Sequence, residues 1–189
     1  ISMSLDIYGS WTKSITLQEF ILLSSINQVK VSSSRSVSQT SNADNSSSIQ
    51  DMTVVNGYDA NGVLIAAAGV GTTVSNDSYG GVTQGTISQT YAIVNGQAKV
   101  ETSRSMTHAV NADGSESWQD GLIHNGIQTQ ASVITYDYDA VGRLQNNGAT
   151  ATDGVTASVE NGNWTTATVK QTYRLINGQA KVNTSQSLT

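Results

Sequence analysis

Alternating polar and apolar residues recur along most of this chain in short runs that end at turn-forming residues. A period of two is typical of β-strands that bury one face, and no stretch shows the 3.6-residue period of a helix. The runs of strand length are Thr53–Val55, Val63–Ala67, Thr86–Val94, Ala131–Tyr138 and Thr165–Ile176. The pattern predicts an all-β fold, in which antiparallel β-hairpin and meander repeats form a sandwich-like or stacked array. It leaves open whether the array is a sandwich, a stacked meander or a solenoid.

Glycine-containing dipeptides separate the runs and mark the expected turns. They are Asn56-Gly57, Gly80-Gly81, Asn95-Gly96, Asn147-Gly148, Asp153-Gly154, Asn161-Gly162 and Asn177-Gly178. Asn-Gly is the dipeptide that most readily adopts the positive φ angles of a two-residue type I′ turn. A strand run on each side of Asn-Gly therefore predicts a β-hairpin.

The clearest hairpin occurs twice. Residues 89–107 and 171–189 are identical at thirteen of nineteen positions and lie 82 residues apart. If Asn95 and Gly96 form the loop, antiparallel pairing gives each copy one apolar face and one mixed face. The apolar face consists of Tyr91, Ile93, Ala98 and Val100 in the first copy, and of Tyr173, Leu175, Ala180 and Val182 in the second. On the mixed face Arg174 lies opposite Lys181, which indicates that this face is solvated.

A second similarity extends the repeat toward the N-terminus. Residues 30–51 align with residues 99–120 at an offset of 69, and both copies contain a four-residue turn sequence beginning Asn-Ala-Asp. Ile49 and Trp118 occupy equivalent positions and are expected to be core residues. The predicted organisation is an N-terminal segment (1–29), repeat unit 1 (30–98), repeat unit 2 (99–180) and the start of a truncated third copy (181–189). Unit 2 is longer by 13 residues, and we expect most of the excess to form a surface excursion around 124–133.

A third repeated element, GYDANGVL at 57–64 and DYDAVGRL at 137–144, resembles the YD (RHS) repeats of large secreted bacterial proteins. The resemblance covers about seven residues in each copy and implies β-hairpin units with an aromatic residue before the turn. More broadly, the proline-free repeats rich in Ser, Thr, Asn and Gly resemble the tandem β-repeats of large bacterial extracellular and adhesin-type proteins. This resemblance implies an extracellular structural role and carries over no catalytic residues.

The N-terminal segment differs from the rest of the chain. Residues 20–23 are continuously apolar, and the flanking serines disfavour the competing interpretation of a short helix, so we predict a strand. Ile26-Asn27 stands where the later copy has Asn95-Gly96. Either the first hairpin has a different turn, or its incoming strand does not pair within the chain.

Composition excludes several classes of function. The net charge of −5 and the pI near 4.7 argue against nucleic-acid binding, which needs a basic surface. The absence of cysteine excludes disulfides and thiolate chemistry. No apolar run approaches the length of a membrane span. Roughly a quarter of the residues are Ser or Thr, which is typical of extracellular β proteins with hydroxyl-lined surfaces.

Candidate chemistry is sparse. His108 and His124 lack neighbours at metal-ligand spacing and are interpreted as exposed structural residues. Asp137, Asp139 and Asp153 could bind calcium, but a turn-forming role is favoured because no calcium-loop motif is present. Trp11, Trp118 and Trp164 could form a sugar-stacking platform, although packing is the favoured interpretation. Phosphate-binding glycine loops and serine-nucleophile motifs are absent, so we predict no cofactor, no metal and no enzyme activity.

The predicted function follows from the two ends of the repeat array. A long uncovered strand edge beside a spare apolar strand is an aggregation hazard unless each completes the other. We therefore predict a structural subunit of an extracellular bacterial filament, which is a head-to-tail homopolymer assembled by donation of the N-terminal strand. The expected interface residues are Ile15, Leu17, Phe20, Ile21, Leu22, Leu23, Ala180, Val182 and Leu188. The alternative is an adhesin or glycan-binding module at the cell surface.

Overall fold

The computed structural model describes all residues 1–189 and contains strands but no helix. No helix is therefore available to cross a membrane. The strands are β1 (Ser2–Leu5), β2 (Trp11–Leu23), β3 (Gln28–Ser41), β4 (Ser47–Tyr58), β5 (Leu64–Asn76), β6 (Val82–Val94), β7 (Gln97–Val110), β8 (Glu116–Gln119), β9 (Ile123–His124), β10 (Ile127–Gln128), β11 (Ser132–Tyr138), β12 (Leu144–Ala151), β13 (Gly154–Glu160), β14 (Asn163–Ile176) and β15 (Gln179–Leu188).

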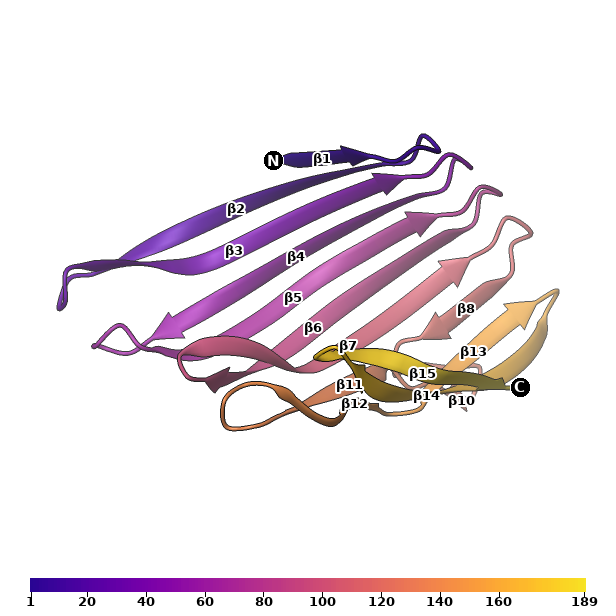
Figure 1. Cartoon of the computed structure of the whole chain (residues 1–189). Helices are drawn as coiled ribbons and strands as arrows, with labels where there is room; N and C mark the ends of the chain where they lie inside the picture. The colour runs from indigo at the N-terminus through magenta and orange to yellow at the C-terminus, as the bar shows by residue number, and fades with distance from the viewer.

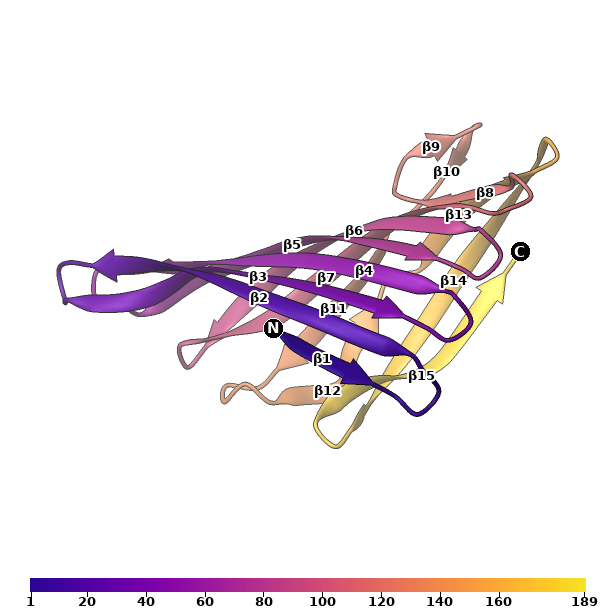
Figure 2. The same cartoon turned by 90° about the horizontal axis from the view of Figure 1, so that it is seen from above.

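Thirteen of these strands form one antiparallel sheet, which confirms the predicted all-β antiparallel meander. The order is β1-β2-β3-β4-β5-β6-β7-β8-β13-β14-β15, with β11 paired to both β7 and β12. The sheet curls, so that β14 and β15 come forward beneath the long strands β2 to β7 (Figure 1). The separate β9–β10 hairpin projects from the opposite, outer side of the sheet (Figure 2).

The two repeat units have the same plan, but unit 2 is interrupted. In unit 1, β3, β4, β5 and β6 pair along most of their lengths. In unit 2, β8 and β11 together occupy the position of β4, while β12 and β13 together occupy that of β5. Residues 121–131 are inserted between β8 and β11 and carry the β9–β10 hairpin, so eleven of the thirteen extra residues are here. The repeat boundaries lie inside β3, β7 and β15, which makes the units sections of one sheet.

Two kinds of turn connect most of the strands. The Asn-Gly hairpins at Asn95-Gly96 and Asn177-Gly178 have positive φ at both residues, as type I′ requires, and their predicted registers are confirmed. The second kind is a five-residue connection, found at both ends of the sheet, that begins with Asp or Asn; in most cases this side chain accepts hydrogen bonds from backbone N–H groups inside the same loop. These connections span 6–10, 42–46, 59–63, 77–81, 111–115 and 139–143.

Three of the predicted turns are wrong. Asp153-Gly154 joins β12 to β13, which run in the same direction, so the chain does not reverse there. Asn56-Gly57 lies inside β4 beside a register shift, and Asn147-Gly148 lies inside β12, where Gly148 has a φ of 82°. Both Asn-Gly dipeptides bend a strand instead of reversing it, a role that glycine also takes in sheets. The absence of a side chain at Gly148 lets β12 approach β15, because a Cβ there would lie 2.9 Å from the Cβ of Ala180.

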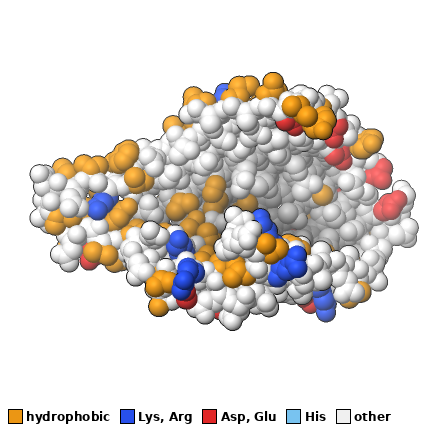
Figure 3. Space-filling view, in the orientation of Figure 1, with side chains coloured by type: hydrophobic (Ala, Val, Ile, Leu, Met, Phe, Trp, Pro, Cys, Tyr) orange, Lys and Arg blue, Asp and Glu red, His pale blue; other side chains and the backbone are white.

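The two faces of the sheet differ in polarity, and few residues on either are enclosed. Only nine of 189 residues are buried. The concave face carries many Ser and Thr side chains and is largely uncoloured in the space-filling view (Figure 3). The convex face, which carries Trp118, also presents exposed apolar side chains at Leu17, Ile49, Val55, Val70, Val74 and Val110.

The prediction that Ile49 is a core residue is wrong, because its side chain is 45% exposed on the convex face, where no second layer covers it. Its equivalent, Trp118, is half-buried because neighbouring aromatic rings cover it. One sequence position of the repeat therefore has two different environments. The difference comes from the neighbouring side chains: His108 stands where unit 1 has Gln39, Trp164 comes from β14, and His124 comes from the residues inserted in unit 2.

The N-terminal segment forms a strand, as predicted, and β2 pairs with β3 through a four-residue turn at 24–27. The first of the two alternatives for this hairpin is therefore correct, and β2 is not a spare strand. Strand β1 covers only Trp11–Ser14 on the other side of β2. Residues 15–23 consequently form an open edge of the sheet.

Close packing on the concave face surrounds two glycines of β5. A Cβ at Gly71 would lie 2.6 Å from the backbone oxygen of Asp51, and one at Gly69 would lie 2.7 Å from the Met52 side chain. Tyr91 also closes over Gly69, with its hydroxyl 3.1 Å from the same Cβ position. These glycines let β4 and β6 pack side chains across the strand that separates them.

Replacing Gly71 with alanine is therefore expected to lower the free energy of unfolding by about 1–3 kcal/mol, since backbone atoms of β4 must move. Urea denaturation followed by far-UV circular dichroism measures the loss. Gly57→Ala is the matched control, because its Cβ would meet nothing closer than 3.4 Å. Equal effects of the two substitutions would contradict the packing described here.

Candidate binding site on the convex face

Four aromatic rings meet on the convex face of unit 2 and form what we call the aromatic cluster: His108, Trp118, His124 and Trp164. Trp118 stacks on His108, His124 and Trp164 with centroid separations of 5.2, 4.7 and 5.6 Å. The interplanar angles of 8°, 15° and 17° show that all three contacts are stacked. The predicted interpretation of the tryptophans as packing residues therefore applies to Trp118 and Trp164.

Strand register brings these rings together. His108 of β7 pairs directly with Trp118 of β8, and Trp118 pairs with Ala157 of β13. Trp164 of β14 pairs with Val159, two residues along β13 on the same face. Ala157 is completely buried, so its small side chain lets the two indoles meet above it. The β9–β10 hairpin then supplies His124, the fourth ring.

Each histidine of the cluster is hydrogen-bonded to a carboxylate. His108 Nε2 lies 2.8 Å from Glu116 Oε2, and His124 Nε2 lies 3.0 Å from Asp120 Oδ2. Both histidines were predicted to be exposed. The His108 side chain is 41% exposed, whereas the His124 side chain is only 19% exposed. The sequence reasoning missed both carboxylate partners, because Glu116 faces His108 across a hairpin.

Asp120 makes more hydrogen bonds than any other carboxylate of the site. Its Oδ1 accepts hydrogen bonds from Leu122 N–H at 2.9 Å and from the Thr129 hydroxyl at 2.8 Å, in addition to the contact with His124. Burial acts to raise the pKa of Asp120, but these hydrogen bonds outweigh it and hold the pKa below its ordinary value of 3.8. Thr129 is 2% exposed and locks the inserted segment onto the sheet through this bond.

A groove of about 760 Å³ lies beside the aromatic cluster, between the convex face and the start of the insertion. Arg104 is its cationic residue, and Asp120, Gly121 and Leu122 form its wall on the side of the insertion. The other lining residues are Thr72, Thr73, Val74, Gln84, Gly85, Thr86, Met106, Thr107 and His108. The groove therefore combines one guanidinium with hydroxyl, amide, imidazole and apolar groups, and with the Asp120 carboxylate, which is hydrogen-bonded to the insertion.

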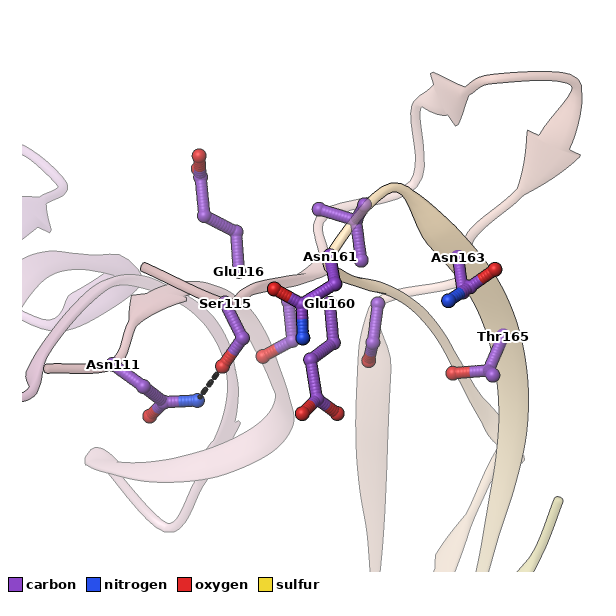
Figure 4. Close-up of a pocket in the computed structure, with 10 residues that line it drawn as sticks. Asn111, Ser115, Glu116, Glu160, Asn161, Asn163 and Thr165 are labelled. Atoms are coloured by element: carbon purple, nitrogen blue, oxygen red, sulfur yellow. Dashed lines mark hydrogen bonds between the residues drawn. The ribbon is translucent and has the colours of Figure 1, made fainter. Parts of the chain in front are cut away.

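A second hollow, of about 500 Å³, lies near the turns of β8 and β13 (Figure 4). Asn111, Asn163 and Thr165 are among its lining residues. The side chains of Glu116 and Glu160 point in opposite directions in this view, so the two carboxylates do not converge. No group of three or more His, Asp or Glu side chains anywhere in the chain could hold a metal ion. This hollow offers a polar surface without reactive chemistry.

The three aspartates considered as calcium ligands each have a different partner within the chain. Asp139 accepts hydrogen bonds from the N–H groups of Val141 and Arg143, which confirms that it forms a turn and holds its pKa low. Asp137 accepts a hydrogen bond from Asn146, and Asp153 pairs with Lys170 at 3.5 Å. The remaining tryptophan, Trp11, lies in β2 and takes part in none of the three stacked contacts.

The predicted interface residues lie at the two opposite edges of the sheet, and the fold does not bring them together. Ile15, Leu17, Phe20, Ile21, Leu22 and Leu23 belong to β2, whereas Ala180, Val182 and Leu188 belong to β15. Several are strongly exposed, including Leu17 at 57% and Phe20 at 61%. Their place at unpaired edges is the geometry that contact between copies would require.

Replacing Trp118 with alanine is expected to lower the free energy of unfolding by about 2–4 kcal/mol, because three stacked rings lose their common partner. Chemical denaturation measures this loss, and near-UV circular dichroism should show that the aromatic signal collapses. Trp11→Ala, which breaks no stacked pair, should cost clearly less. Comparable losses would mean that stacking contributes little.

Replacing Asp120 with asparagine tests how the free energy of unfolding depends on pH in the acidic range. Because the folded pKa of Asp120 is lowered, its stabilisation is present above about pH 3.8 and is lost as the pH falls through the folded value. The variant should be less stable by roughly 1–3 kcal/mol near neutral pH. The gap between the two unfolding free energies should narrow on acidification, and a gap that stays constant down to about pH 2 would exclude this role.

Comparison with known proteins gives this site no relative from which a role could be transferred. Searches of protein-family models, of curated proteins and of solved structures found no match to this chain. The predicted resemblance to YD repeats and adhesin repeats stays a prediction. What the site can do therefore follows from its own geometry.

Proposed function

We propose that this chain is a structural subunit of an extracellular bacterial filament, in which copies join edge to edge by β-strand addition. The observation that carries the proposal is the pair of open edges. Residues 15–23 of β2 have no partner on their outer side, and β15 pairs only with β14. Among residues 1–189, each edge therefore presents a row of unpaired backbone N–H and C=O groups.

The direction of the two edge strands supports joining. Nine successive antiparallel pairings separate β2 from β15, so these strands run in opposite directions within the sheet. Strand β15 of one copy placed beside β2 of the next would continue the antiparallel order without reversing the sheet. Repetition of the same contact would give an open, heterologous polymer.

The two edges carry few of the devices that usually prevent pairing, although Lys181 lies on β15 and one register shift interrupts the pairing of each edge strand. Proline is absent from the chain, and each open edge carries a single charged residue, Glu19 on one and Lys181 on the other. Lysine, proline and bulges are the common protections of free edges in natural sheets. The two charges are opposite in sign, so they favour contact between the edges. The Ser- and Thr-rich surface supports an extracellular location.

The proposal is tested by a charged substitution at the edge. Leu17→Lys, on the open part of β2, should abolish or strongly reduce the filaments seen by negative-stain electron microscopy, because lysine disfavours strand addition. Val70→Lys is the matched control, since Val70 is exposed to a similar degree, 63% against 57%, on the same face of a central strand. The control should still assemble.

Two results would contradict edge-to-edge assembly. One is a wild-type protein that stays monomeric at every concentration in sedimentation experiments. The other is a Val70→Lys variant as defective as Leu17→Lys, which would indicate assembly through the apolar convex face. Circular dichroism spectra of both variants establish that the sheet is intact.

Saccharide binding at a cell surface is a second candidate function, and the groove beside the aromatic cluster favours it. The three rings stacked on Trp118 occupy the surface that a sugar ring would need there, so Trp118 is not a free platform. The groove, in contrast, exposes Gln84 and Thr86, and neither side chain makes a hydrogen bond within the chain. A sugar would therefore bind beside the cluster.

A further inference from the structure

We propose that the groove at Arg104 binds the carboxylate of an acidic saccharide, with Arg104 as its specificity-determining residue. This inference rests on the second candidate function, saccharide binding, and names its ligand class. It is independent of filament assembly. The two repeat units differ at one equivalent pair of charged residues, Arg35–Asp51 in unit 1 and Arg104–Asp120 in unit 2.

In unit 1 the equivalent arginine is neutralised. Arg35 Nε lies 2.9 and 3.1 Å from the two carboxylate oxygens of Asp51, and its Nη2 also contacts Asp51. This bidentate pair fixes the guanidinium and lowers the pKa of Asp51 through the hydrogen bonds from Arg35. The Nε and Nη2 groups of Arg35 are therefore already occupied by Asp51 and cannot bind a second carboxylate.

In unit 2 the same pair is separated. Arg104 and Asp120 are the equivalents of Arg35 and Asp51 at the offset of 69, but the Asp120 carboxylate is bound by Leu122 N–H, Thr129 and His124. All three partners belong to the residues inserted after Asp120. Arg104 retains only a long contact, 3.5 Å from its Nη2 to the backbone oxygen of Asp120. The insertion has thus taken the carboxylate away from the arginine.

The result is a guanidinium with no side-chain counterion in a groove that is open to solvent. Arg104 forms none of the salt bridges in the chain, although it is half-buried. Gly121 leaves room for it, since a Cβ there would lie 3.2 Å from Arg104 Nη2. A guanidinium in this state matches a carboxylate by two parallel hydrogen bonds.

The remaining lining favours a sugar acid over a simple organic anion. Thr72, Gln84 and Thr86 offer hydroxyl and amide groups, and none of these three side chains forms a hydrogen bond within the chain. Val74, Met106 and Leu122 provide an apolar surface for the C–H groups of a sugar ring. One cation beside several free hydrogen-bonding groups is complementary to a saccharide with a single carboxylate on each ring.

The test uses the full chain and isothermal titration calorimetry. The probes are trigalacturonate and sialyllactose, each with its neutral counterpart, α-1,4-linked galactotriose and lactose respectively. The wild type should bind at least one acidic probe and bind its neutral counterpart far more weakly. Arg104→Gln should weaken acidic binding roughly tenfold or more, because charge-assisted hydrogen bonds are lost.

Arg35→Gln is the matched control and should bind like the wild type, because Arg35 already has its carboxylate. A second variant deletes 121–131, so that Asp120 is followed by β11 as Asp51 is followed by the rest of β4. If this variant keeps the β spectrum of the wild type, it should regain the ion pair and lose acidic binding. A folded deletion variant with undiminished affinity would overturn the role of the insertion.

The outcomes separate the two proposals. Equal binding of acidic and neutral probes, or undiminished binding by Arg104→Gln, would overturn the acidic specificity while saccharide binding stands. Failure of the wild type to bind any of the four probes would overturn both. Filament formation by the same samples tests the assembly proposal separately, since Arg104 lies in a central strand.

Discussion

Backbone hydrogen bonding between neighbouring strands is the interaction on which this structure depends. The chain makes 117 backbone–backbone hydrogen bonds, and 101 of them lie within the strand ladders. By contrast, only four hydrophobic residues are buried, namely Ala131, Ala149, Ala157 and Tyr173. A sheet held mainly by its ladder is sensitive to turn geometry, which fixes the register of each hairpin. This dependence explains the recurrence of Asn-Gly and Asp-led turns at the strand ends.

The inserted segment of unit 2 shows how a small addition can create a site on such a sheet. Eleven residues between β8 and β11 bring His124 over Trp118 and bring Thr129 to Asp120. The same residues remove the counterion of Arg104 and form one wall of a groove. Unit 1 keeps the undisturbed arrangement, with Arg35 bound to Asp51. Packing, hydrogen bonding and surface charge all change together because one carboxylate changes partners.

Local patterns in the sequence predicted the strands and the Asn-Gly hairpins, because these depend on neighbouring residues. The register of Tyr91 with Val100 and of Arg174 with Lys181 follows directly from the position of the turn. The curl of the sheet was not predictable in this way, since it depends on strand twist summed over many pairs. For the same reason Ile49 was expected to be buried, although no layer covers its face.

The candidate site could be predicted only in part. His108, His124, Trp118 and Trp164 were noticed as residue types, but they are separated by up to 56 positions and meet only through the register of β7, β8, β13 and β14. Arg104 carried a signal that was overlooked. Its repeat equivalent Arg35 lies sixteen residues before an aspartate, as Arg104 does, and the insertion begins immediately after the second aspartate. Comparing the repeats at that point would have identified it.

The number of strand positions in a repeat has a consequence for how the chain can evolve. Each unit occupies four positions, an even number, so the next unit starts at the same end of the sheet with the same face outward. Gain or loss of a whole unit by recombination between the near-identical segments 89–107 and 171–189 would preserve strand direction and side-chain orientation. Loss of a single strand would turn every later side chain to the wrong side. Length in this architecture is therefore free to vary in whole units only.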